Sequence, residues 1–237
     1  LTFREIRRLS HLAAFHLLEC GFRPRDIVLL QFPNSWEFIV VFFALQKIGV
    51  IPVMCLLPHR HTELTYFAQL TGARGYFFPP RFRNFEYLAM AREIQTAAPC
   101  LEYLVAPGDG AETGVSYLSS WLQQPVEAGD LSAALAAALA PYRPDPFDVA
   151  FLHLSGGTTG IPKLIPRTHA DYICNARACA QALDWDQNTA YLIAIPAAHN
   201  FSLGSPGIVA ALAVGGSVVM CPSTDPELVG TRLGCRF

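Results

Sequence analysis

Hydrophobic and polar residues alternate along this chain in blocks that predict helices and strands in turn. In the first block Thr2 and Glu5 have the spacing of a capping box, apolar residues recur every three or four positions as far as Leu17, and Gly21 stands where a C-cap is expected. Compact apolar runs then alternate with stretches of helical spacing. The predicted strands are 27–30, 50–54, 75–78, 101–105, 149–154, 164–165, 191–195 and a last run ending at 221, and the predicted helices after the first are 35–47, 62–72, 85–95, 169–183 and one ending at 213.

Strands that are apolar along their whole length and are separated by helices are typical of parallel sheets covered on both faces. We therefore predict an α/β fold of mostly parallel sheets with helices on both faces. Residues 107–147 interrupt the pattern with Gly-Asp-Gly, an Ala-rich stretch and several prolines. We predict that this segment is a helix with linkers at the periphery of the same domain, the alternative being a domain boundary.

One stretch also has the hydropathy of a membrane span. Residues 38–57 are interrupted only by Gln46 and Lys47, so hydropathy alone permits a transmembrane helix. However, Gly49 and Pro52 divide the stretch into a helix-length piece and a strand-length piece, which favours two buried core elements. We predict no membrane association.

Composition and charge exclude several classes of protein. With 52% hydrophobic and 15% charged residues, the chain has enough apolar surface to exclude intrinsic disorder, and its net charge of −2 argues against a nucleic-acid partner. Seven scattered cysteines without a C-x-x-C pair, and an N-terminus without a signal sequence, predict free thiols in the cytoplasm. His59 and His61 have no cysteine or acidic cluster at metal spacing, so we predict no metal site.

The segment 155–163 (SGGTTGIPK) follows a predicted buried strand and combines three kinds of group that bind phosphate. Its glycines leave backbone N–H groups unshielded, its hydroxyls add donors, and its lysine supplies a mobile positive charge. These residues are Ser155, Gly156, Gly157, Thr158, Thr159, Gly160 and Lys163. The spacing is not that of a Walker A loop, because Ile161 or Pro162 stands where the second glycine is required. The pattern predicts a polyphosphate-binding loop, with a surface turn that binds no ligand as the alternative.

This motif resembles the phosphate-binding signature of the adenylate-forming superfamily, which includes acyl-CoA ligases, luciferases and adenylation domains. The continuations 164–172 (LIPRTHADY) and 196–207 (PAAHNFSLGSPG) narrow the resemblance to the aryl-acid branch, the 2,3-dihydroxybenzoate–AMP ligases. The earlier stretches 45–49 (LQKIG) and 58–67 (PHRHTELTYF) fit the same branch. The resemblance therefore covers nearly the whole chain.

The resemblance implies an ATP- and Mg²⁺-dependent ligase. An aryl acid, 2,3-dihydroxybenzoate or salicylate, would attack the α-phosphate of ATP, and the aryl-AMP would load an aryl carrier protein in siderophore biosynthesis. Residues 155–163 would hold the β- and γ-phosphates, and Lys163 and His199 would be catalytic. His199, Asn200 and Ser205 would bind the aryl acid, with the last two hydrogen-bonded to its ring hydroxyls.

Each site assignment has a structural alternative. His199 and Asn200 also suit a pair that caps a loop, and Ser205 followed by proline is a common helix start. For His169, a capping or packing role at the start of a helix and contact with a ligand are both open.

The later segments of the family, which bind adenine and ribose and supply a C-terminal lysine, have no match here. We therefore expect residues 1–237 to be a partial N-terminal adenylation domain without the C-terminal lid domain. Two other readings stay open: an inactive truncated remnant of such an enzyme, and part of a general acyl-CoA ligase. We expect the isolated chain to show no aryl-acid-dependent ATP–pyrophosphate exchange.

Overall fold

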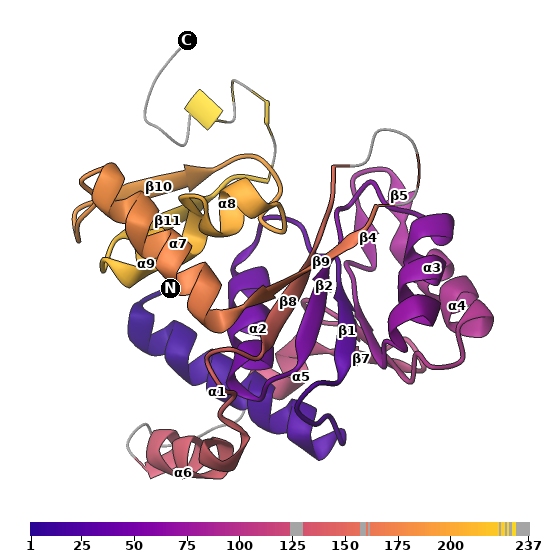
Figure 1. Cartoon of the computed structure of the whole chain (residues 1–237). Helices are drawn as coiled ribbons and strands as arrows, with labels where there is room; N and C mark the ends of the chain where they lie inside the picture. Colours follow the sequence, from indigo (N-terminus) through magenta and orange to yellow (C-terminus); the bar gives the residue numbers. More distant parts are fainter. Residues whose placement is uncertain are drawn as a thin grey trace.

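A computed structural model of the chain describes residues 1–123, 130–156, 160, 162–222, 224, 225, 227, 229 and 230. Its largest element is a seven-stranded sheet in the order β7-β6-β3-β1-β2-β8-β9, with helices on both faces (Figure 1). In chain order these strands are β1 (Ile27–Leu30), β2 (Ile51–Met54), β3 (Gly75–Phe77), β6 (Tyr103–Ala106), β7 (Val115–Tyr117), β8 (Val149–Leu154) and β9 (Leu164–Thr168). The helices are α1 (Phe3–Glu19), α2 (Trp36–Lys47), α3 (His61–Thr71), α4 (Tyr87–Ala97), α5 (Leu118–Leu122), α6 (Asp130–Leu139), the 3-10 helix η1 (Ala140–Tyr142), α7 (His169–Ala182), α8 (Asn200–Gly204) and α9 (Gly207–Ala213).

The strand pairing confirms the predicted fold class. All neighbouring strands of the large sheet run parallel except β8 and β9, which are antiparallel because the glycine-rich segment connects them as a hairpin. At the centre of the sheet, Val28 of β1 is opposite Pro52 of β2 and Gly75 of β3. The α/β prediction of a mostly parallel sheet is therefore correct.

Alternate side chains of the central strands pack into two separate cores. Val28 and Leu30 point into the core formed with α1 and α2, while Leu29 points into the core formed with α3 and α4. All three are fully buried. Because both faces of the sheet are covered, the strands are apolar throughout, which is why their sequence shows continuous runs rather than alternation.

The first helix begins and ends as the sequence predicts. The N–H of Glu5 donates to Thr2 Oγ1 over 3.2 Å and the N–H of Thr2 donates to Glu5 Oε2 over 2.6 Å, completing the capping box. After Cys20, Gly21 has a φ of +84°, the left-handed conformation that closes many helices. The apolar stretch 38–57 divides into α2 and β2, and no helix within the described ranges is long and apolar enough to cross a bilayer.

Three short strands were missed by the sequence analysis. The hairpin of β4 (Arg81–Phe82) and β5 (Phe85–Glu86) delays the start of α4 to Tyr87, two residues after the predicted start. Within the segment 107–147, β7 pairs with β6 at the edge of the large sheet. Each of these strands is only two or three residues long, too short for a periodic pattern to indicate it.

A second sheet of two parallel strands, β10 (Ala190–Ile193) and β11 (Ser217–Met220), lies beside the large one and packs against α9 (Figure 1). The side chain of Asn34, shortly after β1, connects this second sheet to the large sheet by hydrogen bonds. Asn34 Nδ2 donates to the carbonyls of Ile195 and Cys221, each over 2.9 Å, and Oδ1 accepts from the N–H of Ala197 over 2.7 Å. The single helix predicted up to residue 213 is two helices, because Pro206 has no N–H with which to continue α8.

Candidate active site

The glycine-rich segment 155–163 connects β8 to β9 and is closed at its base by two hydrogen bonds. The N–H of Ser155 donates to the carbonyl of Lys163, and the N–H of Lys163 donates to Ser155 Oγ, each over 2.9 Å. Gly156 and Gly160 are exposed, and a Cβ on either would meet none of the described atoms within 4 Å. This part of the loop is therefore open to solvent. Three other predicted phosphate ligands lie outside the described residues: Gly157, Thr158 and Thr159.

The predicted aryl-acid residues lie on and beside the short helix α8. His199 is its N-cap, where Nδ1 accepts a hydrogen bond from the N–H of Phe201 over 3.2 Å, so the capping role considered for His199 is present. Asn200 begins the helix and Ser205 follows its end, and Asn200 Nδ2 donates to Ser205 Oγ over 3.3 Å. The structure therefore brings Asn200 and Ser205 into contact across one turn.

Asn175 of α7 is a further member of this polar cluster, which the sequence analysis did not include. Its Nδ2 donates to Ser205 Oγ over 2.7 Å and to the carbonyl of Gly204 over 2.8 Å. Ser205 Oγ thus accepts from two side-chain amides, Asn175 and Asn200. Because a hydroxyl oxygen has two lone pairs, Ser205 is left with its proton as the group it can offer a ligand.

The buried ring of Tyr172 contacts Asn200, and the buried ring of His153 contacts Tyr172 in turn. The hydroxyl of Tyr172 lies 3.4 Å from both Asn200 Oδ1 and the Asn200 carbonyl, and 3.2 Å from His153 Nε2. Burial, helped by the charges of Arg167 and His199, lowers the pKa of His153 to about 4, and burial raises the pKa of Tyr172. Both rings are therefore neutral near pH 7; Tyr172 contacts Asn200 through its hydroxyl, and His153 contacts that hydroxyl.

Arg167 connects the α8 cluster to the strand that follows the glycine-rich loop. It lies on β9, four residues after Lys163, and its guanidinium binds both carboxylate oxygens of Asp171 over 2.6 and 2.8 Å. The same group lies 3.4 Å from Asn200 Oδ1. Each partner shifts the other's pKa further toward the charged form, upward for Arg167 and downward for Asp171. Within the part of the chain that is described, no hydrogen bond joins Ser155 or Lys163 directly to α8.

Close packing of α8 on α7 requires glycine at position 204. A Cβ there would lie 2.3 Å from ring carbons of Tyr172, closer than any normal contact. Gly207 begins α9 with a φ of +69°, and a Cβ there would lie 2.7 Å from the carbonyl oxygen of Ser202. The glycines of the motif 196–207 therefore allow the helices to approach closely enough to form the polar cluster.

The other histidines singled out from the sequence lie away from this cluster. His169 begins α7, and its Nε2 is buried without a hydrogen-bond partner among the described residues; burial lowers its pKa. His59 Nδ1 accepts from the N–H of Leu56 over 3.1 Å, and His61 pairs with Glu93 over 2.7 Å. The described residues contain no group of three His, Cys, Asp or Glu side chains arranged to hold a metal ion.

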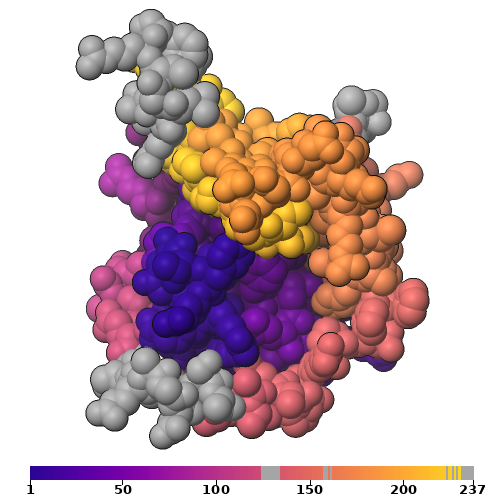
Figure 2. Space-filling view, turned by 90° about the vertical axis from the view of Figure 1, so that its left-hand side faces the viewer, coloured from indigo at the N-terminus to yellow at the C-terminus, as the bar shows by residue number. Residues whose placement is uncertain are grey.

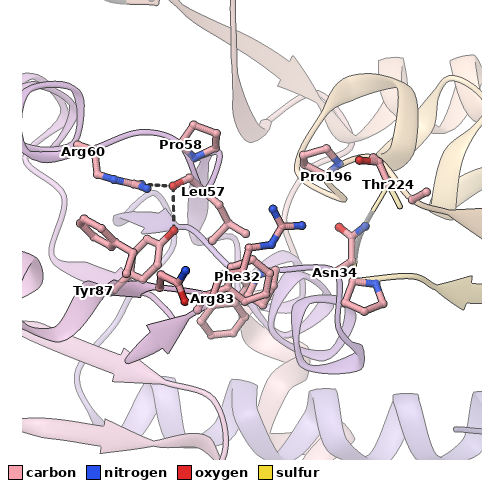
Figure 3. Close-up of a pocket in the computed structure, with 15 residues that line it drawn as sticks. Phe32, Asn34, Leu57, Pro58, Arg60, Arg83, Tyr87, Pro196 and Thr224 are labelled. Atoms are coloured by element: carbon pink, nitrogen blue, oxygen red, sulfur yellow. Dashed lines mark hydrogen bonds between the residues drawn. The ribbon is translucent and has the colours of Figure 1, made fainter. Parts of the chain in front are cut away.

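A cavity of about 610 Å³ lies between the C-terminal ends of the central strands, the β4–β5 hairpin and the small sheet. Figure 3 shows Arg60 beside it, with the Leu57 carbonyl accepting from both Arg60 and the hydroxyl of Tyr87, while Asn34 and Pro196 approach from the opposite side. None of the predicted catalytic, phosphate-binding or aryl-acid residues within the described ranges lines this cavity. The cavity and the α8 cluster are therefore distinct features.

The chain is similar to known proteins in both sequence and structure. Among curated relatives, the salicyl-AMP ligase / salicyl-S-ArCP synthetase of Mycobacterium tuberculosis is 40% identical over 227 residues, which cover 96% of this chain and 38% of the relative. The 2,3-dihydroxybenzoate-AMP ligase of Bacillus subtilis is 36% identical over 226 residues, covering 95% of this chain and 39% of the relative. This chain thus spans about two fifths of the length of these proteins.

The chain is also similar to solved structures. The apo structure of MbtA from Mycobacterium smegmatis superposes with a TM-score of 0.84 and 36% identity, covering 98% of this chain and 41% of that one. The anthranilate CoA ligase AuaEII in complex with anthranoyl-AMP has a TM-score of 0.78 and 26% identity, covering 94% of this chain and 40% of that one. A family model described as AMP-binding enzyme matches residues 1–233. The predicted resemblance to the aryl-acid branch of the adenylate-forming enzymes is confirmed, and the chain belongs to the AMP-binding enzyme family.

Proposed function

We propose that this chain contributes the phosphate-binding loop and the aryl-acid pocket of a ligase that converts 2,3-dihydroxybenzoate or salicylate to aryl-AMP. In the proposed reaction a carboxylate oxygen of the acid forms a bond to the α-phosphorus of ATP, and the bond from that phosphorus to the bridging oxygen of the β-phosphate breaks, releasing pyrophosphate. The aryl group would then pass to the thiol of an aryl carrier protein for siderophore biosynthesis, in the cytoplasm. Support comes from the family and from the names of the relatives described above.

The observation that carries the proposal is the polar cluster of Asn175, Asn200 and Ser205. Ser205 Oγ accepts from both amides, so its proton is free for a ligand, and Asn200 Nδ2 retains one hydrogen beyond its bond to Ser205. Asn200 Oδ1 lies 3.4 Å from donors on both Arg167 and Tyr172. The cluster therefore offers donors, and a phenolic oxygen on the acid is the acceptor that matches it. An acid without that oxygen would leave these donors unpaired, which disfavours its binding.

The phosphate end of the site would be the hairpin 155–163. Its hydrogen-bonded base sets Lys163 beside Ser155, and the exposed glycines admit an anion close to the backbone. Lys163 and the backbone N–H groups would stabilise the negative charge that develops on pyrophosphate as it departs. Mg²⁺ bound to ATP would add positive charge at the same phosphates. His199, exposed at the start of α8, would lie beside the acceptor carboxylate and the adenylate.

Aryl-acid-dependent ATP–pyrophosphate exchange tests the proposal in a full-length protein that contains this segment. We expect exchange with salicylate and 2,3-dihydroxybenzoate and little with benzoate or hexanoate. Asn200→Ala should lower kcat/KM for the hydroxylated acids by about 10- to 100-fold, the effect of losing a buried hydrogen bond worth about 1.5–3 kcal/mol. Lys163→Ala should lower exchange with every acid. Unchanged dihydroxybenzoate activity in Asn200→Ala would refute the pocket assignment.

A second candidate function, that of an acyl-CoA ligase, differs in the thiol that accepts the aryl group. The similarity to an anthranilate CoA ligase favours testing transfer to CoA beside transfer to a carrier protein. We expect the aryl group to move to the phosphopantetheine thiol of an aryl carrier protein; faster transfer to CoA would support the acyl-CoA ligase alternative. The isolated 237-residue chain, tested in parallel, is expected to show no exchange, as the truncated-remnant reading also requires.

A further inference from the structure

A second cavity, open to solvent, lies on the opposite side of α7 from the α8 cluster and is bordered by α1, α2, α6, η1 and the first half of α7. Its volume is about 920 Å³, within the range of about 300–1,000 Å³ that small-molecule sites occupy. In the space-filling view of Figure 2, the purple region that contains α2 is recessed between indigo α1 and the orange and pink segments that contain α7 and α6. We call this hollow the basic cavity.

Among the described residues that line the basic cavity, all ionisable side chains are basic. They are Arg7, His11, Lys47, Arg143, His169 and Arg177. Four of the chain's seventeen lysines and arginines are thus gathered here, with no aspartate or glutamate among the described residues of the lining. None of these four charges has an ion pair or a side-chain hydrogen bond within the described part of the chain. Asp148 acts on His169 from nearby, but its carboxylate is already bound by Arg25 over 3.2 Å.

Like charges gathered without a counter-charge repel one another, so the cluster is more stable with an anion present. Burial lowers the pKa of Lys47, and repulsion from the neighbouring Arg7 lowers it further. One guanidinium group can bind two oxygens of the same phosphate, and Lys47 adds a compact point charge. The lining is therefore matched to an anion with more than one negative charge.

His11 is an independent indication that the cavity binds a polar ligand. The residue is only 7% exposed and lines the cavity, yet its Nδ1 is buried without a hydrogen-bond partner among the described residues. Burial, then Lys47 and Arg7, lower its pKa to about 4, so the imidazole is neutral near pH 7. Buried polar atoms in proteins normally have a partner, and an unexplained exception points to a missing one.

The rest of the lining is apolar and includes Phe43, Leu139 and Ile173. We propose that the basic cavity binds a small phosphate ester, with the phosphate held by the arginines, Lys47 and His11, and the organic group packed against this apolar wall. Its residues are separate from Lys163, Asn200 and Ser205, so the proposal does not depend on the ligase activity proposed above.

Titration of the 237-residue chain with phenyl phosphate, followed by calorimetry and by ³¹P line broadening, tests this site. Inorganic phosphate and benzyl alcohol are the comparison probes, since each has only one half of the expected ligand. We expect saturable binding of phenyl phosphate, tighter than that of either probe. Inorganic phosphate binding as tightly as phenyl phosphate would overturn the apolar part of the proposal.

The variant Arg143→Gln/Arg177→Gln should weaken phenyl phosphate binding at least tenfold. Both residues are exposed, so the fold should tolerate the change. Arg4→Gln, one turn before Arg7 on α1 and outside the cavity, should bind as the unaltered chain does. Lys163→Ala should also bind normally. Absence of saturable binding, binding unaffected by the double substitution, or binding lost in Lys163→Ala would each overturn the proposal, the last by placing the phosphate at the hairpin 155–163.

Discussion

The two sides of helix α7 differ in how their polar groups are satisfied. Toward α8, Tyr172 and Asn175 are hydrogen-bonded to Asn200, Ser205 and the backbone of Gly204. On the other side, the lining of the basic cavity includes His169, whose Nε2 has no partner, and Arg177, which has no ion pair within the described ranges. A network paired within the chain keeps its geometry before a ligand arrives, whereas charges without a partner in the chain stay available to an anionic ligand.

The substitution Gly204→Ala should have the largest effect, and it acts on the paired side of α7. The added methyl group would overlap the buried ring of Tyr172, so α8 could no longer approach α7 and the paired side would come apart. We expect a loss of about 3 kcal/mol in the free energy of unfolding, measured by urea denaturation, at the upper end of overpacking effects.

Gly156→Ala is the matched control, because a Cβ at that position would meet none of the described atoms within 4 Å. It should change the stability by less than about 0.5 kcal/mol, as surface substitutions usually do. Equal stability of the two variants would mean that α7 and α8 are not packed as closely as described.

The second prediction is that the fold loses stability in acid, and it involves one buried imidazole on each side of α7. His153 under the α8 cluster and His11 in the basic cavity both have pKa values lowered to about 4, against 6.5 for a free side chain. Between pH 6.5 and 4 the unfolded chain therefore binds protons that the folded chain does not. Stability should be constant just above pH 6.5 and fall on acidification by up to about 1.4 kcal/mol per pH unit for each group.

His153→Gln should reduce that slope while keeping a hydrogen-bonding partner for Tyr172. Saturating phenyl phosphate should reduce the part that belongs to His11, because a bound anion favours its protonation in the folded state. Urea unfolding at a series of pH values measures both. A slope that His153→Gln leaves unchanged would contradict the buried, neutral state of His153.

Much of this fold was predictable because its central strands are buried on both faces. The bounds of β1 and β8 match the apolar runs, and the capping box marked the start of α1. The strand β7 was missed because three residues at a sheet edge carry no pattern. Its pairing with β6 depends on the tertiary fold, which local spacing does not encode.

The candidate site was predictable only in part, for a similar reason. Asn200 and Ser205 were identified from one contiguous motif, and they contact each other. His153 and Asn175 come from β8 and α7, distant in sequence, and neither belongs to the glycine-rich signal. Their roles arise from hydrogen bonds between packed elements. The basic cavity has no sequence signal either, because its cations come from four separate segments.

The third prediction removes hydrogen bonds from the side of α7 that faces α8. Asn175→Leu keeps a side chain of similar size but removes the donors to Ser205 Oγ and to the carbonyl of buried Gly204. We expect a loss of about 1–2 kcal/mol in unfolding free energy, because the Gly204 carbonyl loses its side-chain donor and Ser205 Oγ loses one of its two donors. Gln181→Leu, at an exposed position of the same helix, is the control and should have little effect. If the two variants have equal stability, the cluster does not contribute to holding α7 on α8.

The smallest predicted effect is a gain in stability, and it concerns the side of α7 that faces the basic cavity. Arg177→Gln removes one of the unpaired positive charges of the basic cavity, so without a ligand it should raise the unfolding free energy by about 0.5 kcal/mol at low ionic strength. The gain should vanish in high salt, where repulsion between exposed charges is screened. Arg81→Gln is the contrasting control: Arg81 pairs with Glu86 over 3.1 Å, so its loss should lower stability slightly. Urea denaturation at two salt concentrations measures both differences. A destabilising Arg177→Gln would mean that this arginine already has its counter-charge in the free chain, which would remove the reason for a ligand in the basic cavity.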